Sequence, residues 1–350
     1  MVSAKAEIKS SLMTLSDYIH RLKSVNSLSK HEQIINGVIE AIDHGSLKVG
    51  DQLPSINVMV DEVGYARKTI VNAYEELKDR GLVESKKNKG YFIISKEINQ
   101  RKKVALLMYA FERFQEAFYN TLRAEMGESV QIDVFFHHSN LQVFESILTN
   151  IYGKYGVYVI APIEDQSVAV QLKRIPPEKL VIIDRNLDLG SQYNYVTQEF
   201  CHATKQLMIE LLPRIQAFQK VVLFFRSDRD YPEGVLEAFR QLVDEYGLKA
   251  EVLNQYKPGS VCAGSLYVFV SDSDMWNILL DCRNKSLRIG KDIGLLSFND
   301  HIMKDLIFDG ITTISTSFTE MAKATANRIE DMGNPQSIVI PTRLIKRNSL

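Results

Sequence analysis

The chain has 350 residues, of which 45% are hydrophobic and 24% charged, and its formal net charge is −1. This length predicts two or three domains, and this hydrophobic content excludes a largely disordered chain. The charges are unevenly distributed, because residues 1–103 carry 17 Lys and Arg against 13 Asp and Glu, whereas residues 104–350 carry 25 against 30. A basic front and an acidic rear favour a nucleic-acid-binding module fused to a domain of another kind.

The cysteines and histidines show no pattern of a metal or redox site. Cys201, Cys262 and Cys282 are scattered, with no CxxC pair and no histidine at ligand spacing, so we expect free thiols and no bound metal. The adjacent His137 and His138 lack partner ligands, and we expect them at the surface. No signal-like apolar segment and no run near the ~20 apolar residues of a membrane span is present, so we expect a cytoplasmic protein without a membrane partner.

The front of the chain predicts three helices. Ser29 and Glu32 form a capping box before an amphipathic helix that ends at Gly45. A second helix is expected over residues 54–64, and a third over residues 67–79. The first turns of the third helix are polar and basic, with Arg67, Lys68, Thr69 and Asn72. On a lone helix this would be a solvated face, but a recognition helix inserts this part into the major groove.

Residues 82–85 and 91–94 predict the two strands of a hairpin. The tip of this hairpin is cationic and consists of Lys86, Lys87, Asn88, Lys89 and Gly90. Such lysines often serve only solubility. Beside a helix-turn-helix they favour a wing that contacts phosphates or the minor groove.

Residues 30–94 resemble the GntR-type winged-helix domain. The matching motifs are Gly50-Asp51-Gln52-Leu53-Pro54-Ser55, Arg67-Lys68-Thr69-Ile70, Gly81-Leu82-Val83 and Gly90-Tyr91-Phe92, with Gly45 and Leu77 at the family's spacing. The resemblance implies binding of double-stranded operator DNA. With the charged helix face, the predicted DNA-binding residues are Ser55, Arg67, Lys68, Thr69, Asn72, Lys87, Asn88, Lys89 and Gly90. Two positions depart from the family, because Ala66 replaces a usual capping Ser and Asn72 replaces a common second Arg.

The predicted organisation has four parts: a helical extension over residues 1–28, a winged helix-turn-helix over 29–95, a linker over 96–103 and an effector domain over 104–350. The extension carries an apolar stripe at helical spacing, made of Leu12, Leu15, Tyr18, Ile19 and Leu22. This stripe fits packing on the winged helix or packing across a dimer, and the sequence leaves both open.

The rear of the chain alternates buried strands with helices. The expected strands cover residues 104–108, 131–136, 157–160, 180–183, 221–225, 266–270 and 293–298. This alternation predicts an α/β fold with parallel sheets, and its length fits two lobes. In open sheets the ligand lies beyond the carboxyl ends of the strands. These ends are polar here, with Asp184-Arg185-Asn186, Arg226-Ser227-Asp228, Ser271-Asp272-Ser273-Asp274 and Asn299-Asp300.

Polar strand ends beside aromatic rings suit a sugar, whose hydroxyls need donors and acceptors and whose C–H face stacks on rings. The candidate rings are Phe111, Phe114 and Tyr256. Residues 104–350 resemble the LacI/GalR-type effector domain, most clearly at 180–185, 270–272, 289–300, 311–314 and 340–349. The resemblance implies effector contacts by Asp184, Tyr256, Ser271, Asn299 and Thr316, to which the strand ends add Arg185, Asp272 and Asp300. Glu233 lies near the place of a ligand-binding Arg of the family, which indicates a neutral ligand.

These features together predict a sugar-responsive, DNA-binding transcription regulator, a homodimer and a repressor, without a cofactor. A regulator of the same architecture that senses a purine or an amino acid is the main alternative. An enzyme acting on a sugar or sugar phosphate is a weaker one, because the chain has no Gly-rich phosphate loop, nucleophile elbow or HExxH motif.

Overall fold

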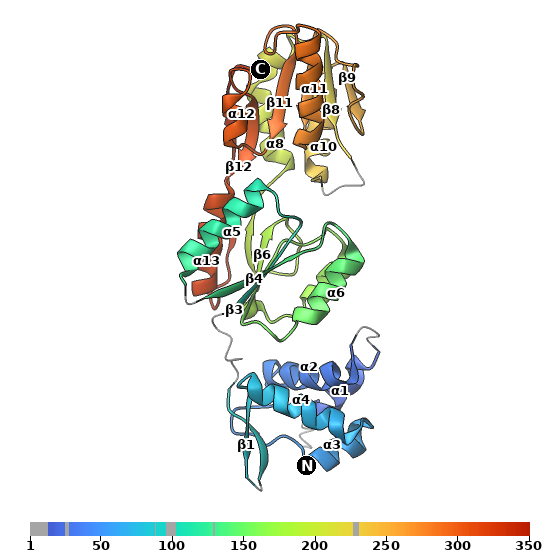
Figure 1. The fold of residues 1–350 in the computed structure, drawn as a ribbon, viewed down its shortest axis with the longest axis vertical. Helices are drawn as coiled ribbons and strands as arrows, with labels where there is room; N and C mark the ends of the chain where they lie inside the picture. Colours follow the sequence, from blue (N-terminus) through green and yellow to red (C-terminus); the bar gives the residue numbers. More distant parts are fainter. Residues whose placement is uncertain (1–12, 25–27, 88, 96–102, 129, 227–230) are drawn as a thin grey trace, which may run out of the picture.

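The computed structural model describes residues 13–24, 28–87, 89–95, 103–128, 130–226 and 231–350. Along the longest axis the chain forms a helical front domain, a first α/β lobe and a second α/β lobe (Figure 1). The N-terminal domain lies at one end of this axis and the second lobe at the other. The α/β fold with an N-terminal helix-turn-helix and two parallel-sheet lobes is therefore confirmed.

The front domain has the expected winged-helix elements. Its helices are α1 (Leu15–Leu22), α2 (Lys30–Asp43), α3 (Ile56–Val63) and α4 (Arg67–Asp79), and its antiparallel hairpin consists of β1 (Val83–Lys86) and β2 (Gly90–Ile93). Ser29 and Glu32 make the predicted capping box at the start of α2. Gly64 ends α3 at φ 72°, a left-handed conformation that glycine adopts readily. Ala66 precedes α4 without a side-chain cap.

Helix α1 packs on the front domain itself. Leu15, Tyr18 and Ile19 are buried in the core that α2, α3 and α4 share, and Leu22 is buried as well. The two helices approach closely at Gly37 of α2, where a Cβ atom would lie 2.5 Å from Cγ1 of Ile19. Within the described residues the apolar stripe is therefore used for packing inside the chain, and Leu12 lies outside them.

The first lobe is built on a six-stranded sheet, all of whose pairs are parallel, in the order β13-β7-β6-β5-β3-β4. The strands are β3 (Lys103–Met108), β4 (Gln131–Phe136), β5 (Val157–Ile160), β6 (Leu180–Asp184), β7 (Asn194–Thr197) and β13 (Ser337–Val339). Helices α6 (Leu141–Ile151) and α7 (Gln166–Leu172) cover one face. Helices α5 (Arg113–Met126) and α13 (Phe318–Glu330) cover the other, and a short 3-10 helix, η1 (Pro177–Lys179), precedes β6.

The second lobe repeats this architecture in the order β14-β12-β11-β10-β8-β9. The strands are β8 (Lys220–Phe224), β9 (Ala250–Leu253), β10 (Ser265–Phe269), β11 (Gly294–Phe298), β12 (Thr312–Thr316) and β14 (Thr342–Ile345), of which only β14 pairs antiparallel. One face carries α8 (Cys201–Glu210), α9 (Leu212–Ile215) and α10 (Glu233–Tyr246). The other carries α11 (Asp272–Asn284) and α12 (Ile302–Leu306).

The chain crosses between the two lobes three times, after β7, after β12 and after β13. These crossings hold the carboxyl ends of the two sheets facing each other. In two-lobed folds, such connecting segments act as a hinge about which the angle between the lobes can change. Strands β7, β9, β13 and β14 are absent from the sequence prediction, and β12 was noted only as a motif. Each of the four is only three or four residues long, and β9 and β13 are largely exposed, so they show no buried apolar run.

The two adjacent histidines differ in their exposure to solvent. His137 is buried, not at the surface, because its ring bonds the Ala161 carbonyl at 3.1 Å through Nε2 and accepts from the Ser139 N–H through Nδ1. His138 is exposed, as expected.

In the described part of the chain, Cys201, Cys262 and Cys282 are free thiols, and no cluster of three His, Cys, Asp or Glu side chains is placed to hold a metal. No helix among the described residues has the length and apolarity needed to cross a membrane.

The front domain is docked on the first lobe through charged side chains. Lys179 Nζ lies 3.0 Å from Asp43 Oδ1, and Arg174 Nη2 lies 3.5 Å from Glu40 Oε1. Arg80, at the end of α4, donates to the carbonyl of Gly153 at 3.0 Å. Figure 1 shows α2 beside this lobe and α3 at the opposite side of the domain.

These contacts are largely removed from water. The side chains of Glu40 and Asp43 are only 4% and 11% exposed, and burial raises the pKa of the Asp43 carboxyl although the Lys179 ammonium opposes this shift. A buried carboxylate that loses its partner costs far more than an exposed one. Glu40 also pairs with Arg21 of the front domain itself, whereas Asp43 takes its cation, Lys179, from the first lobe. The docked arrangement therefore depends most on Lys179.

We expect the substitution Lys179→Met to release the front domain, because Asp43 would recover its hydration only by leaving the interface. Hydrogen exchange at α2 and limited proteolysis between the domains should both increase. Lys346→Met is the matched control, because Lys346 pairs with Glu210 in an exposed contact of 3.7 Å, and such pairs contribute little. Unchanged exchange at α2 in the Lys179 variant would show that the ion pair does not hold the domains together.

Candidate functional site

The front domain presents a polar surface formed by the start of α4 and the hairpin tip. Arg67, Lys68 and Asn72 are exposed on α4, and Thr69 is half-buried between them. Ser55 is exposed but already caps α3, because its hydroxyl accepts from the Val58 N–H at 3.3 Å. Lys87, Lys89 and Gly90 are exposed at the hairpin tip, and Asn88 lies outside the described residues.

Two residues that the sequence prediction missed orient this surface. Asn57, on α3, accepts a hydrogen bond from the guanidinium of Arg67. Gln52 donates to the carbonyl of Lys89 and so ties the hairpin tip to the loop before α3. Asn57 belongs to no motif or charged pattern, so no signal in the sequence marks it. Gln52 stands in the matching motif at residues 50–55, but it was not among the predicted DNA-binding residues. The result is a helix start and a wing held on the same side of the domain.

The second candidate site is a cavity of about 1060 Å³ between the two lobes. Its wall is formed by residues that follow the carboxyl ends of strands in both sheets, as open parallel sheets require. The predicted effector residues that line it are Phe111, Phe114, Asp184, Arg185, Tyr256, Ser271, Asp272, Asn299 and Thr316. Glu233 and Asp300 do not line it.

The first-lobe side of the cavity is made by the ends of β3 and β6. Asp184 has a positive φ of 64° and accepts a hydrogen bond from Gln198. Arg185 lies over the ring of Phe200, with its guanidinium carbon 5.0 Å from the ring centre. Phe111 is 57% exposed, so its ring is available for stacking on a ligand.

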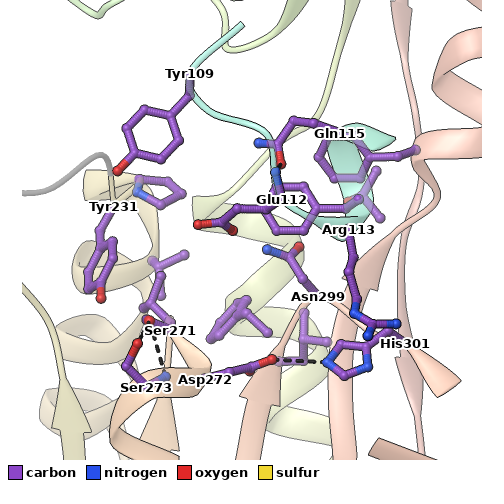
Figure 2. Close-up of a pocket in the computed structure, with 18 of the residues that line it drawn as sticks. Tyr109, Glu112, Arg113, Gln115, Tyr231, Ser271, Asp272, Ser273, Asn299 and His301 are labelled. Carbon is purple, nitrogen blue, oxygen red and sulfur yellow. Dashed lines mark hydrogen bonds and ion pairs between the residues drawn. The ribbon is translucent and has the colours of Figure 1, made fainter. Parts of the chain in front are cut away.

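The second-lobe side centres on Asp272, at the start of α11. One oxygen of this carboxylate lies 2.6 Å from Lys304 Nζ, and the other lies 3.1 Å from His301 Nε2 (Figure 2). Ser271 caps α11 by accepting from the Ser273 N–H. Asn299 adopts a left-handed φ of 58° at the end of β11, which is rare for a residue other than glycine. Figure 2 shows Asn299, Ser271 and Asp272 arranged around the same space as Glu112 and Tyr231.

Asp300 and Tyr256 have other partners. Asp300 accepts from Arg347 and from Thr313, and although burial acts to raise its pKa, these hydrogen bonds hold the pKa below its ordinary value. Tyr256 is buried, and its hydroxyl donates to Asp281; burial, with this bond, raises the pKa of the phenol. Tyr256 therefore reaches the cavity only with part of its ring, and Asp300 anchors the C-terminal segment.

Charged residues line the cavity, and several of them are outside the predicted effector set. Among the described residues, the lining includes three arginines, Arg113, Arg185 and Arg226, and six carboxylate residues, Glu112, Glu116, Asp184, Glu199, Asp272 and Asp274. Glu233 alone therefore does not indicate a neutral ligand, because arginines line the cavity from other segments. The excess of carboxylates nevertheless disfavours an acidic ligand.

A two-lobed periplasmic-binding-type fold with a winged helix at its N-terminal end defines the class of this chain. Residues 30–93 match the family described as "Bacterial regulatory proteins, gntR family", and residues 216–350 match the "Periplasmic binding protein-like domain". The chain therefore joins a gntR-type helix-turn-helix domain to a periplasmic-binding-protein-like domain, and the two resemblances expected from its motifs are confirmed.

The curated relatives match a short part of the chain. The chain is 32% identical over 73 residues to the uncharacterized HTH-type transcriptional regulator YdfD of Bacillus subtilis. This match covers 21% of this chain and 15% of that protein. It is 32% identical over 62 residues to the HTH-type transcriptional regulator Rv1152 of Mycobacterium tuberculosis, covering 18% of this chain and 51% of that protein. The chain thus spans 15% of the length of the first relative and about half of the length of the second.

Solved structures resemble the rear domain in fold. A LacI family transcriptional regulator from Lactobacillus casei, solved with bound glucose, aligns with a TM-score of 0.60 at 11% identity and covers 71% of this chain and 100% of that one. A transcription regulator like protein from Staphylococcus haemolyticus aligns with a TM-score of 0.58 at 15% identity, covering 72% and 99%. At such identities the likeness establishes the fold alone.

Proposed function

We propose that this protein is a transcription regulator, and a repressor, whose binding to operator DNA is modulated by a small neutral sugar in the inter-lobe cavity. The observation that carries this proposal is the presence, on one chain, of an exposed basic helix start with a lysine wing and of a large polar cavity. The functional units would be residues 29–95 for DNA and 104–350 for the effector, with the segment 96–103 between them.

The chemistry of the cavity supports a polyhydroxylated ligand. Carboxylates and amides such as Asp184, Asp272, Gln198 and Asn299 offer paired acceptors and donors, and exposed aromatic rings such as Phe111 offer stacking surfaces. The Lactobacillus casei regulator of similar fold was solved with glucose and with sucrose. A purine would use the same rings and amides, so it remains the second candidate effector.

A ligand panel separates these candidates. The single tryptophan of the chain, Trp276, lines the cavity, so its fluorescence should change when the cavity fills. We expect a saturable change and a rise in melting temperature with at least one monosaccharide, and none with adenine, guanine or amino acids. A response to a nucleobase alone would contradict the sugar proposal. Turnover of a sugar or sugar phosphate would contradict a purely regulatory role.

We propose that two copies associate through the second lobe. Helices α11 and α12 expose apolar side chains, among them Leu280, Ile302 and Leu306, with Phe308 in the following turn. Exposed apolar side chains, when they gather on one face, are typical of a protein interface. A two-fold dimer would present two winged helices to a palindromic operator. Elution as a monomer in size-exclusion chromatography, with and without operator DNA, would contradict this assembly.

We expect the exposed cationic side chains of the front domain to have different roles on DNA. Arg67, oriented by Asn57, is the group we expect to read a base edge, whereas Lys89 at the hairpin tip would contact phosphate. Arg67→Ala should cost about 1–3 kcal/mol on the operator and relax base preference. Lys89→Ala should weaken binding to all sequences alike and reduce its salt dependence.

Competition titrations with operator and scrambled DNA measure both effects. The Arg67 variant should lose the difference between the two DNAs, and the Lys89 variant should keep it. A uniform loss in both variants would show that Arg67 contacts only the backbone.

The docked front domain supports coupling between the two sites. Because Asp43, Glu40 and Arg80 all contact the first lobe, a change in the angle between the lobes would move the winged helices of a dimer as rigid extensions of their first lobes. Sugar binding would favour the closed arrangement, since only there do groups from both lobes reach one ligand. The closed dimer would then fit its two half-sites less well.

A further inference from the structure

Lys304 lies beneath the second-lobe wall of the cavity and has no part in the function proposed so far. Its side chain is fully buried, and it is the only buried lysine among the described residues. It sits on the inner face of α12, whose outer face exposes Ile302 and Leu306. Burial lowers the pKa of the Lys304 ammonium, and the neighbouring Asp272 opposes this shift. A buried ammonium persists only where its surroundings supply charge and acceptors.

Four groups supply these contacts. Lys304 Nζ lies 2.6 Å from Asp272 Oδ1, and donates to Ser297 Oγ at 3.0 Å and to the carbonyls of Phe298 and Asn299 at 2.7 Å each. The partners come from the start of α11 and from the end of β11. The ammonium therefore bridges the start of α11 and the end of β11, next to the direct contact between Ser297 Oγ and Asp272 Oδ1 at 3.3 Å.

Two of the groups held in this way line the cavity. Asp272 and Asn299 both face it, whereas Lys304 is not part of the wall. Asn299 keeps a left-handed φ of 58°, and the hydrogen bond to its carbonyl helps to hold this costly conformation. Lys304 is thus a positioning residue for both.

The ammonium also sets the charge of this wall. One oxygen of Asp272 has the Lys304 ammonium as its counter-charge, the other lies near His301 Nε2, and the nearby Asp300 has Arg347. The buried ammonium therefore balances the charge of Asp272 from behind the wall. The Asp272 side chain is still 28% exposed, so it can accept a hydrogen bond from a ligand.

We propose that Lys304 is a specificity-determining residue of the cavity, because it neutralises Asp272 and so makes this wall prefer a hydroxyl group over an ammonium group. Without Lys304, Asp272 would lose its ammonium counter-charge and keep only His301 and the Ser297 hydroxyl as partners, so it would attract cationic ligands more strongly. This inference rests on the proposed function in taking the effector to be a sugar in the inter-lobe cavity.

Matched sugars that differ in one charged group test the proposal. The probes are D-glucose and D-glucosamine, D-galactose and D-galactosamine, and D-mannose and D-mannosamine. They are titrated at about pH 7, where an amino group of this type is still mostly protonated and an ordinary imidazole is mostly neutral. Trp276 fluorescence reports binding to the full-length protein. The variants are Lys304→Met and Lys304→Gln, both of which remove the charge while the second retains a donor.

The wild-type protein should prefer the neutral member of each pair that binds. In both variants the ratio of amino-sugar to sugar affinity should rise about tenfold or more, since a carboxylate without its ammonium counter-charge favours the cation. Lys285→Met is the control and should leave this ratio unchanged, because Lys285 donates to the carbonyls of Gly259 and Val261 outside the cavity. Equal weakening of both sugars in a pair would overturn the proposal, since a merely structural lysine would have that effect.

A double-mutant cycle, measured by urea unfolding without any ligand, tests the positioning role of Lys304. Asp272→Asn leaves a buried ammonium without its counter-charge, whereas Lys304→Met leaves a carboxylate that water reaches. The urea midpoint, followed by Trp276 fluorescence, should fall further for Asp272→Asn than for Lys304→Met, and the double variant should recover part of the loss. A lower urea midpoint for Lys304→Met than for Asp272→Asn would contradict the pairing of Lys304 with Asp272. If no sugar or amino sugar binds any form, sugar sensing fails, and the cycle still decides whether Lys304 holds this wall.

Discussion

The function proposed for this protein depends on the charged contact between its winged helix and its first lobe. Asp43 and Glu40 at the end of α2 are buried against Lys179 and Arg174, and Arg80 closes the contact on the Gly153 carbonyl. Charged groups in such a place are stable only in one geometry, because each loses its hydration and regains it through a specific partner. The contact therefore favours one orientation of the two domains, and Lys179, the cation that faces the buried Asp43, is the side chain on which we expect it to depend most.

The same constraint explains how a cavity far from DNA could affect DNA binding. The cavity is lined from both lobes, and the chain crosses between the lobes three times, so the angle between the lobes is the coordinate that a ligand would change. If the winged helix were joined to the lobes only by a flexible linker, the movement of the lobes would not be transmitted to it. Because the domain is docked, the movement would reach α4 and the wing. The surface of α4 and the wing, meanwhile, takes no part in the docking contacts and stays exposed.

The sequence predicted the front domain closely, because its signals are local. The capping box at Ser29, the left-handed Gly64 and the turn at Gly90 each act within a few residues. The buried strands of both lobes were also evident as apolar runs. The strands β7, β9, β13 and β14 were missed because they are short and owe their position to pairing with distant segments.

The candidate site was predicted only in part, for a related physical reason. Residues directly after strands, such as Asp184, Asp272 and Asn299, follow from the rule that parallel sheets bind at their carboxyl ends. Lys304 and the docking pairs depend on contacts between elements that are not neighbours in sequence, and Asp300 was misplaced because its partner, Arg347, lies 47 residues further along the chain. No periodicity or spacing encodes such pairs.

The central claim is that the cavity and the DNA surface share one conformational equilibrium. Calorimetric titration of the panel sugar that binds most tightly, with and without saturating operator DNA, tests it directly. Linkage requires that operator DNA weaken sugar binding by the factor by which sugar weakens operator binding, which corresponds to a coupling of about 1–3 kcal/mol. We therefore expect a sugar affinity roughly 5- to 150-fold lower on DNA. Equal sugar affinities in the two titrations would contradict the account.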